Sequence, residues 1–225
     1  MNKAKSVMKN EIIDDLNSRY TTKKYDPSKK IPKEKLDILY EAMRLSASSI
    51  NSQPWKFIVL KTQEAKQRMF NTFKNKHQFN QQHVIECDQV ILFAHNPYYT
   101  LADYTKVIEK YIQDGRITED EKQKAFGSFV FAQINSDSSG CNENWTKAQL
   151  YLALGNTLHT LARLKIDSTP LEGIDVDLVA KEFEDELKNY HCHVALAIGY
   201  HHEVEDFNFK LPKSRLSHDD IFVHL

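Results

Sequence analysis

One polar stretch with short hydrogen-bonding side chains joins a predicted helix to a predicted strand: Ser48-Ser49-Ile50-Asn51-Ser52-Gln53-Pro54-Trp55. Helical hydrogen bonding ends there, so Ser48, Ser49, Asn51 and the local backbone are free to bind another molecule. Ser and Asn are also ordinary loop residues, and Pro54 is an ordinary helix stop. A binding turn and a plain turn are both compatible with this stretch alone.

A phosphate-bearing ligand would have to be held by side chains in this chain. The sequence contains six glycines and neither Gly-x-Gly-x-x-Gly nor a Walker pattern. Arg19, Lys213 and Arg215 are the candidates, because a phosphate monoester carries about two negative charges and Arg presents a fork of donors suited to it. As isolated surface cations they would have no such role.

Histidine and cysteine offer a different chemistry. His191 and His193 alternate onto one face of a predicted strand and His201-His202 follow, so these four imidazoles could gather round a metal as in a metal-dependent hydrolase. No Cys or carboxylate stands at ligand spacing with them. Cys141 and Cys192 have no assignable base, and without a Cys-x-x-Cys pair the three cysteines indicate neither disulfides nor a zinc ribbon.

Alternating helices and strands must position these groups. Apolar periodicity predicts helices over 11–18, from 32 to the polar stretch, 63–73, 119–133, 143–164 and 176–188, and a further helix through Leu101 and Tyr111. Strands are expected over 55–60, 89–94, 166–171 and 192–198, and the continuous apolar run 89–94 predicts a central strand. The pattern favours a mixed α/β (α+β) sheet in a single domain, 1–225. Residues 98–142 form a helical excursion, and 203–225 form a C-terminal arm with apolar residues that need a surface to cover them.

Composition excludes several classes of partner. With 30 basic and 31 acidic residues there is no electrostatic footprint for nucleic acid or an anionic membrane. No apolar run approaches the roughly 20 residues that span a bilayer, and the first residues are not a signal-peptide core. We therefore expect no nucleic acid partner, no membrane partner and a cytoplasmic location.

Five segments in order resemble the FMN-dependent nitroreductase family, particularly its oxygen-insensitive bacterial NAD(P)H branch, which includes dihydropteridine reductase-like members. The polar stretch is similar to that family's Ser-Ser-x-Asn-x-Gln-Pro-Trp turn. The other four segments are Arg19-Tyr20-Thr21-Thr22-Lys23, Phe79-Asn80, Pro170-Leu171-Glu172-Gly173 and Leu211-Pro212-Lys213-Ser214-Arg215-Leu216. Together they span nearly the whole chain.

The resemblance implies a set of cofactor-binding residues. Arg19, Lys213 and Arg215 would hold the FMN phosphate and ribityl chain, with Tyr20 and Thr21 in the same segment. Lys23 would lie near N1 and O2 of the ring, Asn80 at its pyrimidine edge, and Glu172 and Gly173 at N5 with Pro170 shaping the approach. Phe131 would screen acceptors, or is a core-facing helix residue instead. His83 stands where relatives have a flavin-contacting lysine, which leaves that contact open.

The same resemblance implies the activity and assembly. Ser48, Ser49 and Asn51 would reach the flavin from the opposite subunit of an intertwined homodimer, whose C-terminal arms wrap the partner. NADH or NADPH would give a hydride to flavin N5, and a nitroaromatic, quinone, flavin or pterin would then take two electrons in a ping-pong mechanism. A protein that binds FMN for storage or sensing, without turnover, is the alternative. The physiological acceptor and the preferred nicotinamide stay open.

Overall fold

Four strands form the sheet at the centre of this computed structural model, which describes residues 10–225. They are β1 (Trp55–Leu60), β2 (Gln89–His95), β3 (Asp167–Leu171) and β4 (His191–Gly199), in the spatial order β1-β2-β4-β3. Every residue of β2 is buried, because this strand is paired on both edges and covered on both faces. The prediction of a central strand here is confirmed.

The pairings between these strands are antiparallel. A parallel contact comes from the isolated bridge between Thr21 and Ser168, beside β3. Pro170 lies in β3, which is an edge strand of this sheet, where a residue without an N–H is tolerated. The open side of β3 is therefore where the segment around Thr21 runs.

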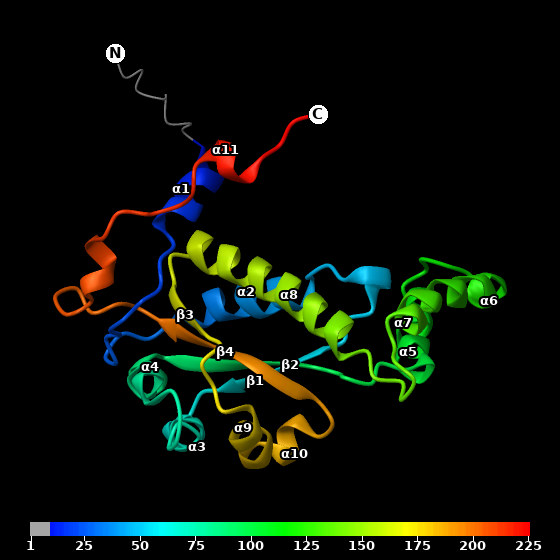
Figure 1. Ribbon diagram of the computed structural model, residues 1–225, viewed down its shortest axis with the longest axis horizontal. Helices are drawn as coiled ribbons and strands as arrows, with labels where there is room; N and C mark the ends of the chain where they lie inside the picture. The colour runs from blue at the N-terminus through cyan, green and yellow to red at the C-terminus, as the bar shows by residue number, and fades with distance from the viewer. Residues whose placement is uncertain (1–9) are drawn as a thin grey trace.

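Helices cover both faces of the sheet (Figure 1). One face carries α2 (Lys33–Arg44) and α8 (Glu143–Arg163), and the other carries α3 (Gln63–Asn71), α4 (Gln81–Glu86), α9 (Val176–Glu182) and α10 (Glu184–Leu187). Successive residues of β2 serve the two cores in turn, as strand geometry requires. Ile91 and Phe93 pack in the α2 and α8 cluster, while Val90 and Leu92 pack in the opposite one.

The apolar stretch within α8 is covered on one side only in this chain. Leu150, Ala153 and Leu154 are buried, whereas Tyr151 and Leu152 are exposed. Its inner side therefore lies in the core. Its outer side leaves apolar surface without a cover.

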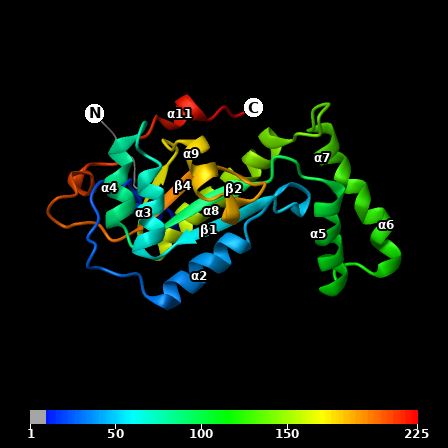
Figure 2. The same ribbon diagram turned by 90° about the horizontal axis from the view of Figure 1, so that it is seen from below.

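The segment predicted as a helical excursion stands beside the sheet (Figures 1 and 2). It contains α5 (Leu101–Gln113), the 3-10 turns η3 (Glu119–Glu121) and η4 (Phe126–Phe129), and the short helices α6 (Lys122–Ala125) and α7 (Val130–Ile134). The helix expected over 119–133 forms as an unbroken helical run that alternates between 3-10 and α geometry, and Gly127 and Ser128, which are poor helix formers, lie in its second 3-10 turn. A small core of its own, which includes Tyr104 and Ile108, holds the excursion together.

The first described helix and the C-terminal end of the chain lie at the same side of the molecule (Figure 1). Helix α1 (Glu11–Ser18) lies there with the C-terminal arm, which contains η5 (Phe207–Lys210) and α11 (His218–Ile221). The apolar side chains of the arm are between 48% and 84% exposed: Phe207, Phe209, Leu211, Leu216, Ile221, Phe222 and Val223. Among residues 10–225, no helix combines the length and apolar character needed to cross a membrane.

Candidate functional site

Three cations from opposite ends of the sequence line one cleft. Arg19 ends α1, with its amide bonded to the Asp15 carbonyl at 3.1 Å, and the arm brings Lys213 and Arg215 beside it. The Lys213 ammonium donates a hydrogen bond to the Arg19 carbonyl. The cleft encloses about 440 Å³, and Tyr20 and Thr21 also line it. The structure thus brings together residues that lie almost 200 positions apart.

The electrostatics of this cleft favour an anion. Burial and the charge of Arg215 lower the pKa of the Arg19 guanidinium. Burial, followed by the charges of Arg19 and Arg215, lowers the pKa of the Lys213 ammonium. No Asp or Glu lines the cleft, so the three positive charges repel one another without a carboxylate between them. A phosphate would relieve this repulsion and accept their hydrogen bonds.

A buried aspartate that the sequence reasoning missed anchors the segment leading away from the cleft. Asp206 is 1% exposed and accepts hydrogen bonds from the Tyr20 hydroxyl at 2.9 Å and from the Lys23 amide at 3.2 Å. The Thr22 carbonyl accepts a bond from the Thr169 hydroxyl of β3 at 2.6 Å. Tyr20, Thr21 and Lys23 are therefore fixed along the edge of the sheet. No sequence pattern marks Asp206 for this role.

Asn80 and Gly173 meet beyond the other end of β3. Asn80 closes the 3-10 turn η2 (Gln78–Asn80), is buried, and donates a hydrogen bond to the Gly173 carbonyl at 2.8 Å. A Cβ on Gly173 would lie 3.0 Å from His77 Nδ1 and 3.1 Å from Asn80 Nδ2. Close packing therefore accounts for a glycine at this position. The neighbouring Glu172 carboxylate accepts a bond from the Tyr151 hydroxyl at 2.5 Å.

His83 is a neutral side chain in this region. It is buried on α4, and burial, followed by the charge of Lys23, lowers the pKa of its imidazole. Its Nδ1 atom is buried and has no hydrogen-bond partner within residues 10–225. At neutral pH His83 offers no cation in place of the lysine expected at this position, but its Nδ1 remains available as a polar contact.

The Ser48, Ser49 and Asn51 turn does not join this cleft within one chain. It follows α2 and lies toward the excursion, whereas α1 and the C-terminal arm, whose residues line the cleft, lie at the other end of the molecule (Figures 1 and 2). The backbone there is unusual, because Ile50, Asn51 and Gln53 have φ values of 50°, 54° and 45°. The Ser49 amide donates to Gln149 Oε1 at 2.8 Å, and the Gln53 amide donates to the Ser48 hydroxyl at 3.0 Å. Entry of this turn into a partner's site stays a prediction.

Phe131 also lies apart from the cleft. It is on α7 in the excursion and is 50% exposed. The alternative that it is a core-facing residue is wrong, because the inner face of this region is occupied by Ala132, Tyr104 and their neighbours. Its role as an acceptor screen stays a prediction.

The four histidines that the sequence offered as an alternative metal site do not come together. His191 and His193 lie at the start of β4, while His201 and His202 follow its far end, where His201 Nδ1 bonds the Asp167 carboxylate at 2.8 Å. The nine-residue strand keeps the two pairs apart. Cys192 is poorly placed as a nucleophile, since burial raises the pKa of its thiol to about 12.

Comparison with known proteins identifies this arrangement. The Nitroreductase family matches this chain over residues 16–200. The chain belongs to the Nitroreductase family. It is 59% identical to the major NAD(P)H-flavin oxidoreductase of Aliivibrio fischeri, covering 97% of this chain and 100% of that protein. It is 36% identical to the oxygen-insensitive NAD(P)H nitroreductase of Salmonella typhimurium, over 92% of this chain and 95% of that protein.

Solved structures agree with this nitroreductase-family assignment at the level of the fold. A protein of Exiguobacterium sibiricum 255-15, crystallised in complex with FMN, superposes with a TM-score of 0.80 at 21% identity over 97% of this chain and 99% of its own. A nitroreductase family protein of Streptococcus pneumoniae TIGR4 superposes with a TM-score of 0.73 at 22% sequence identity, over 96% of this chain and 100% of its own. The family, fold class and oxidoreductase class predicted from sequence are confirmed, and the relatives' names agree with the predicted cofactors.

Proposed function

We propose that this chain is an FMN-dependent oxidoreductase that uses NADH or NADPH to reduce free flavin, with nitroaromatics, quinones and pterins as further acceptors. The observation that carries the proposal is the cleft in which Arg19, Lys213 and Arg215 meet without a carboxylate. The names of the two relatives, at 59% and 36% identity, support the nicotinamide donor, and the name of the first supports the proposal of free flavin as an acceptor.

The chain's own residues fit FMN along the edge of β3. The three cations would bind the phosphate, with Tyr20 and Thr21 beside them, and Lys23, Asn80, Pro170, Glu172 and Gly173 would hold the ring. When bound, FMN supplies the redox chemistry, taking a hydride from the nicotinamide and passing two electrons to the acceptor in alternating half-reactions. The buried, unpartnered Nδ1 of His83 is a further polar contact available in this region.

Each ring-binding residue has a role that follows from its surroundings. Asp206 fixes the backbone of Lys23, from which the Lys23 ammonium would reach a bound ring and favour negative charge on its reduced form. The Gly173 carbonyl orients the Asn80 amide. The absence of a side chain at Gly173 lets its backbone pack closely against His77 and Asn80, which sets the position of the Asn80 amide.

A homodimer would complete the site. One chain places the Ser48, Ser49 and Asn51 turn away from its own cleft, so these residues would serve the cleft of the second subunit. The exposed apolar side chains of the arm and of α8 provide surface for the partner to cover. In this assembly residues 1–225 act as one nitroreductase-like domain, and the arm from 203 to 225 wraps the other subunit.

An anaerobic spectrum of the purified protein tests the activity. Bound flavin should bleach when NADH or NADPH is added, and free FMN, a quinone or a nitroaromatic should restore the colour. The faster-bleaching nicotinamide is the preferred donor. A flavin that stays oxidised with both donors would favour storage or sensing, and a colourless protein that takes up no FMN would contradict the cofactor assignment.

A further inference from the structure

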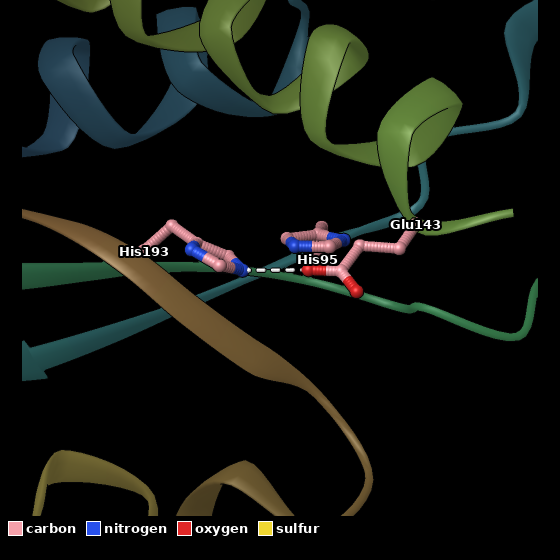
Figure 3. Close-up of side chains that lie close together, drawn as sticks. All are labelled: His95, Glu143 and His193. Carbon is pink, nitrogen blue, oxygen red and sulfur yellow. Dashed lines mark hydrogen bonds and ion pairs between the residues drawn. The ribbon is translucent and has the colours of Figure 1, made fainter. Parts of the chain in front are cut away.

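Two histidines and a glutamate from three different elements converge beyond one end of the sheet (Figure 3). His95 ends β2, His193 lies near the start of β4, and Glu143 is the first residue of α8. Each offers one nitrogen or oxygen atom, and these three atoms all lie within 4.8 Å of one another. His193 Nε2 is 3.0 Å from Glu143 Oε1, and the His95 and His193 rings stack with centroids 5.1 Å apart.

His95 is held in the form that a metal requires. Its side chain is fully buried, and its Nδ1 lies 2.9 Å from the Thr146 hydroxyl oxygen. The backbone carbonyls of Asn142 and Glu143 lie 3.3 Å and 3.1 Å from that hydroxyl as acceptors for its proton, which favours the tautomer in which His95 Nδ1–H donates to the hydroxyl oxygen. Nε2 therefore carries the lone pair, and it has no hydrogen-bond partner within residues 10–225. Such a second-shell bond commonly fixes a metal-binding imidazole.

We propose that His95, His193 and Glu143 bind a divalent transition metal of the zinc class. Two imidazoles and one carboxylate form a three-ligand set that leaves a fourth position for water. Imidazole ligands favour zinc and its neighbours over magnesium or calcium, which prefer oxygen. The metal would join the end of β2, the start of β4 and the start of α8, and the site is separate from the cofactor cleft.

The site needs a small contraction that its members permit. Bonds of about 2.0–2.2 Å in a tetrahedron put ligand atoms roughly 3.3 Å apart, and the His193 to Glu143 distance of 3.0 Å is already close to this. His193 and Glu143 are partly exposed and free to move inward, whereas His95 is fixed in the core. Their exposed side also gives an ion a route of entry.

A plain hydrogen bond between His193 and Glu143 is the competing explanation. It accounts for that pair and for an acidic residue in the first turn of α8. It leaves His95 Nε2 buried without a partner, which is costly unless something else pairs with it. The pairs His201 with Asp167 and His202 with Glu205 lack a third ligand, and so provide matched controls within the same chain.

Zinc binding to the intact flavin-loaded protein tests the proposal. The protein is stripped with a chelator, dialysed, and titrated with Zn²⁺ against a chromogenic competitor at neutral pH. We expect one zinc per chain, and a tenfold or larger loss of affinity in both His193→Ala and Glu143→Gln. Thr146→Val should lower the zinc affinity about tenfold to a hundredfold, because it removes the hydroxyl that orients the His95 ring. The control His202→Ala should bind as the wild type does.

Thermal melting gives a second readout that does not depend on activity. Zinc at about 100 times its dissociation constant should raise the wild-type melting temperature by roughly 5–10 °C and leave Glu143→Gln unchanged. An unaltered flavin absorption spectrum in each variant shows that the fold is retained. The proposal is overturned if the wild type binds no zinc, or if His193→Ala and Glu143→Gln bind it as tightly as His202→Ala does.

Discussion

Replacing Arg215 with alanine should lower the affinity for FMN without lowering the stability of the apoprotein. The lost contact is a charge-assisted hydrogen bond to a phosphate, worth about 1.5–3 kcal/mol, which is roughly a tenfold to a hundredfold loss of affinity. Arg215 is exposed, so solvent screening places the effect toward the lower end. In the apoprotein the charge of Arg215 contributes to lowering the pKa values of Arg19 and Lys213. Its removal should therefore leave the stability of the apoprotein unchanged or raised.

Flavin fluorescence titration of the apoprotein measures the first effect, and denaturant unfolding measures the second. Lys210→Ala is the matched control, because Lys210 is an exposed cation of the same arm but does not line the cleft. The difference between wild type and Arg215→Ala should shrink as salt rises from 0.1 M to 1 M, where the screening length falls from about 10 Å to 3 Å. Equal FMN affinity in wild type and Arg215→Ala, or an equal loss in Lys210→Ala, would refute the assignment of the phosphate to this cleft.

Four further outcomes are expected. Gly173→Ala should lower the free energy of unfolding by about 1–3 kcal/mol, measured with denaturant, and weaken FMN binding, because its Cβ would press on His77 and Asn80. Gly155→Ala is the control: its Cβ meets nothing within 4 Å, so it should leave the stability unchanged or raise it. Tyr25→Phe removes buried hydrogen bonds to Thr169 Oγ1 at 2.9 Å and the Ala197 carbonyl at 3.0 Å, and should cost about 1–3 kcal/mol, or about 2–4 °C of melting temperature for each kcal/mol. The folded-state pKa of His83 lies below 6.5, so the unfolded chain takes up a proton at this residue first as the pH falls, and the free energy of unfolding drops below pH 6.5. His83→Gln should make the free energy of unfolding depend less on pH between pH 7.5 and 5.5, and an unchanged slope would argue against this role. Deleting 216–225 removes exposed apolar residues of the arm, so light scattering should show more monomer than in the full chain, and an unaltered dimer would assign the contact to α8 alone.

The sequence predicts the elements of this fold well wherever a single pattern decides. The apolar run of β2 indicated a strand covered on both faces, and the long apolar periodicity of α8 set its position to within a residue. The helix expected over 119–133 forms, but periodicity alone does not predict that it alternates between α and 3-10 geometry, as it does at Gly127 and Ser128. Local patterns, in short, predict local structure.

The site is less accessible to sequence reasoning because it depends on distant contacts. Arg19 and Lys213 lie 194 positions apart, so their meeting follows from the family resemblance and not from any spacing. The His95, Glu143 and His193 cluster depends on the antiparallel pairing of β2 and β4 and on the placement of α8. The available signal for this cluster was a histidine, His95, at the end of one apolar strand and two alternating histidines in another. The register that brings these strands together cannot be read from either strand alone.

The left-handed turn after α2 has a consequence for chimaeric proteins. Ile50 adopts a φ of 50°, which costs a β-branched residue roughly 1–2 kcal/mol, yet its side chain packs against the small core of the excursion. That packing offsets the backbone cost, so the turn and the excursion behave as one exchangeable module. Grafting a relative's residues 98–142 into this chain without also transplanting 48–53 would leave Ile50 in its disfavoured conformation with no apolar surface to compensate.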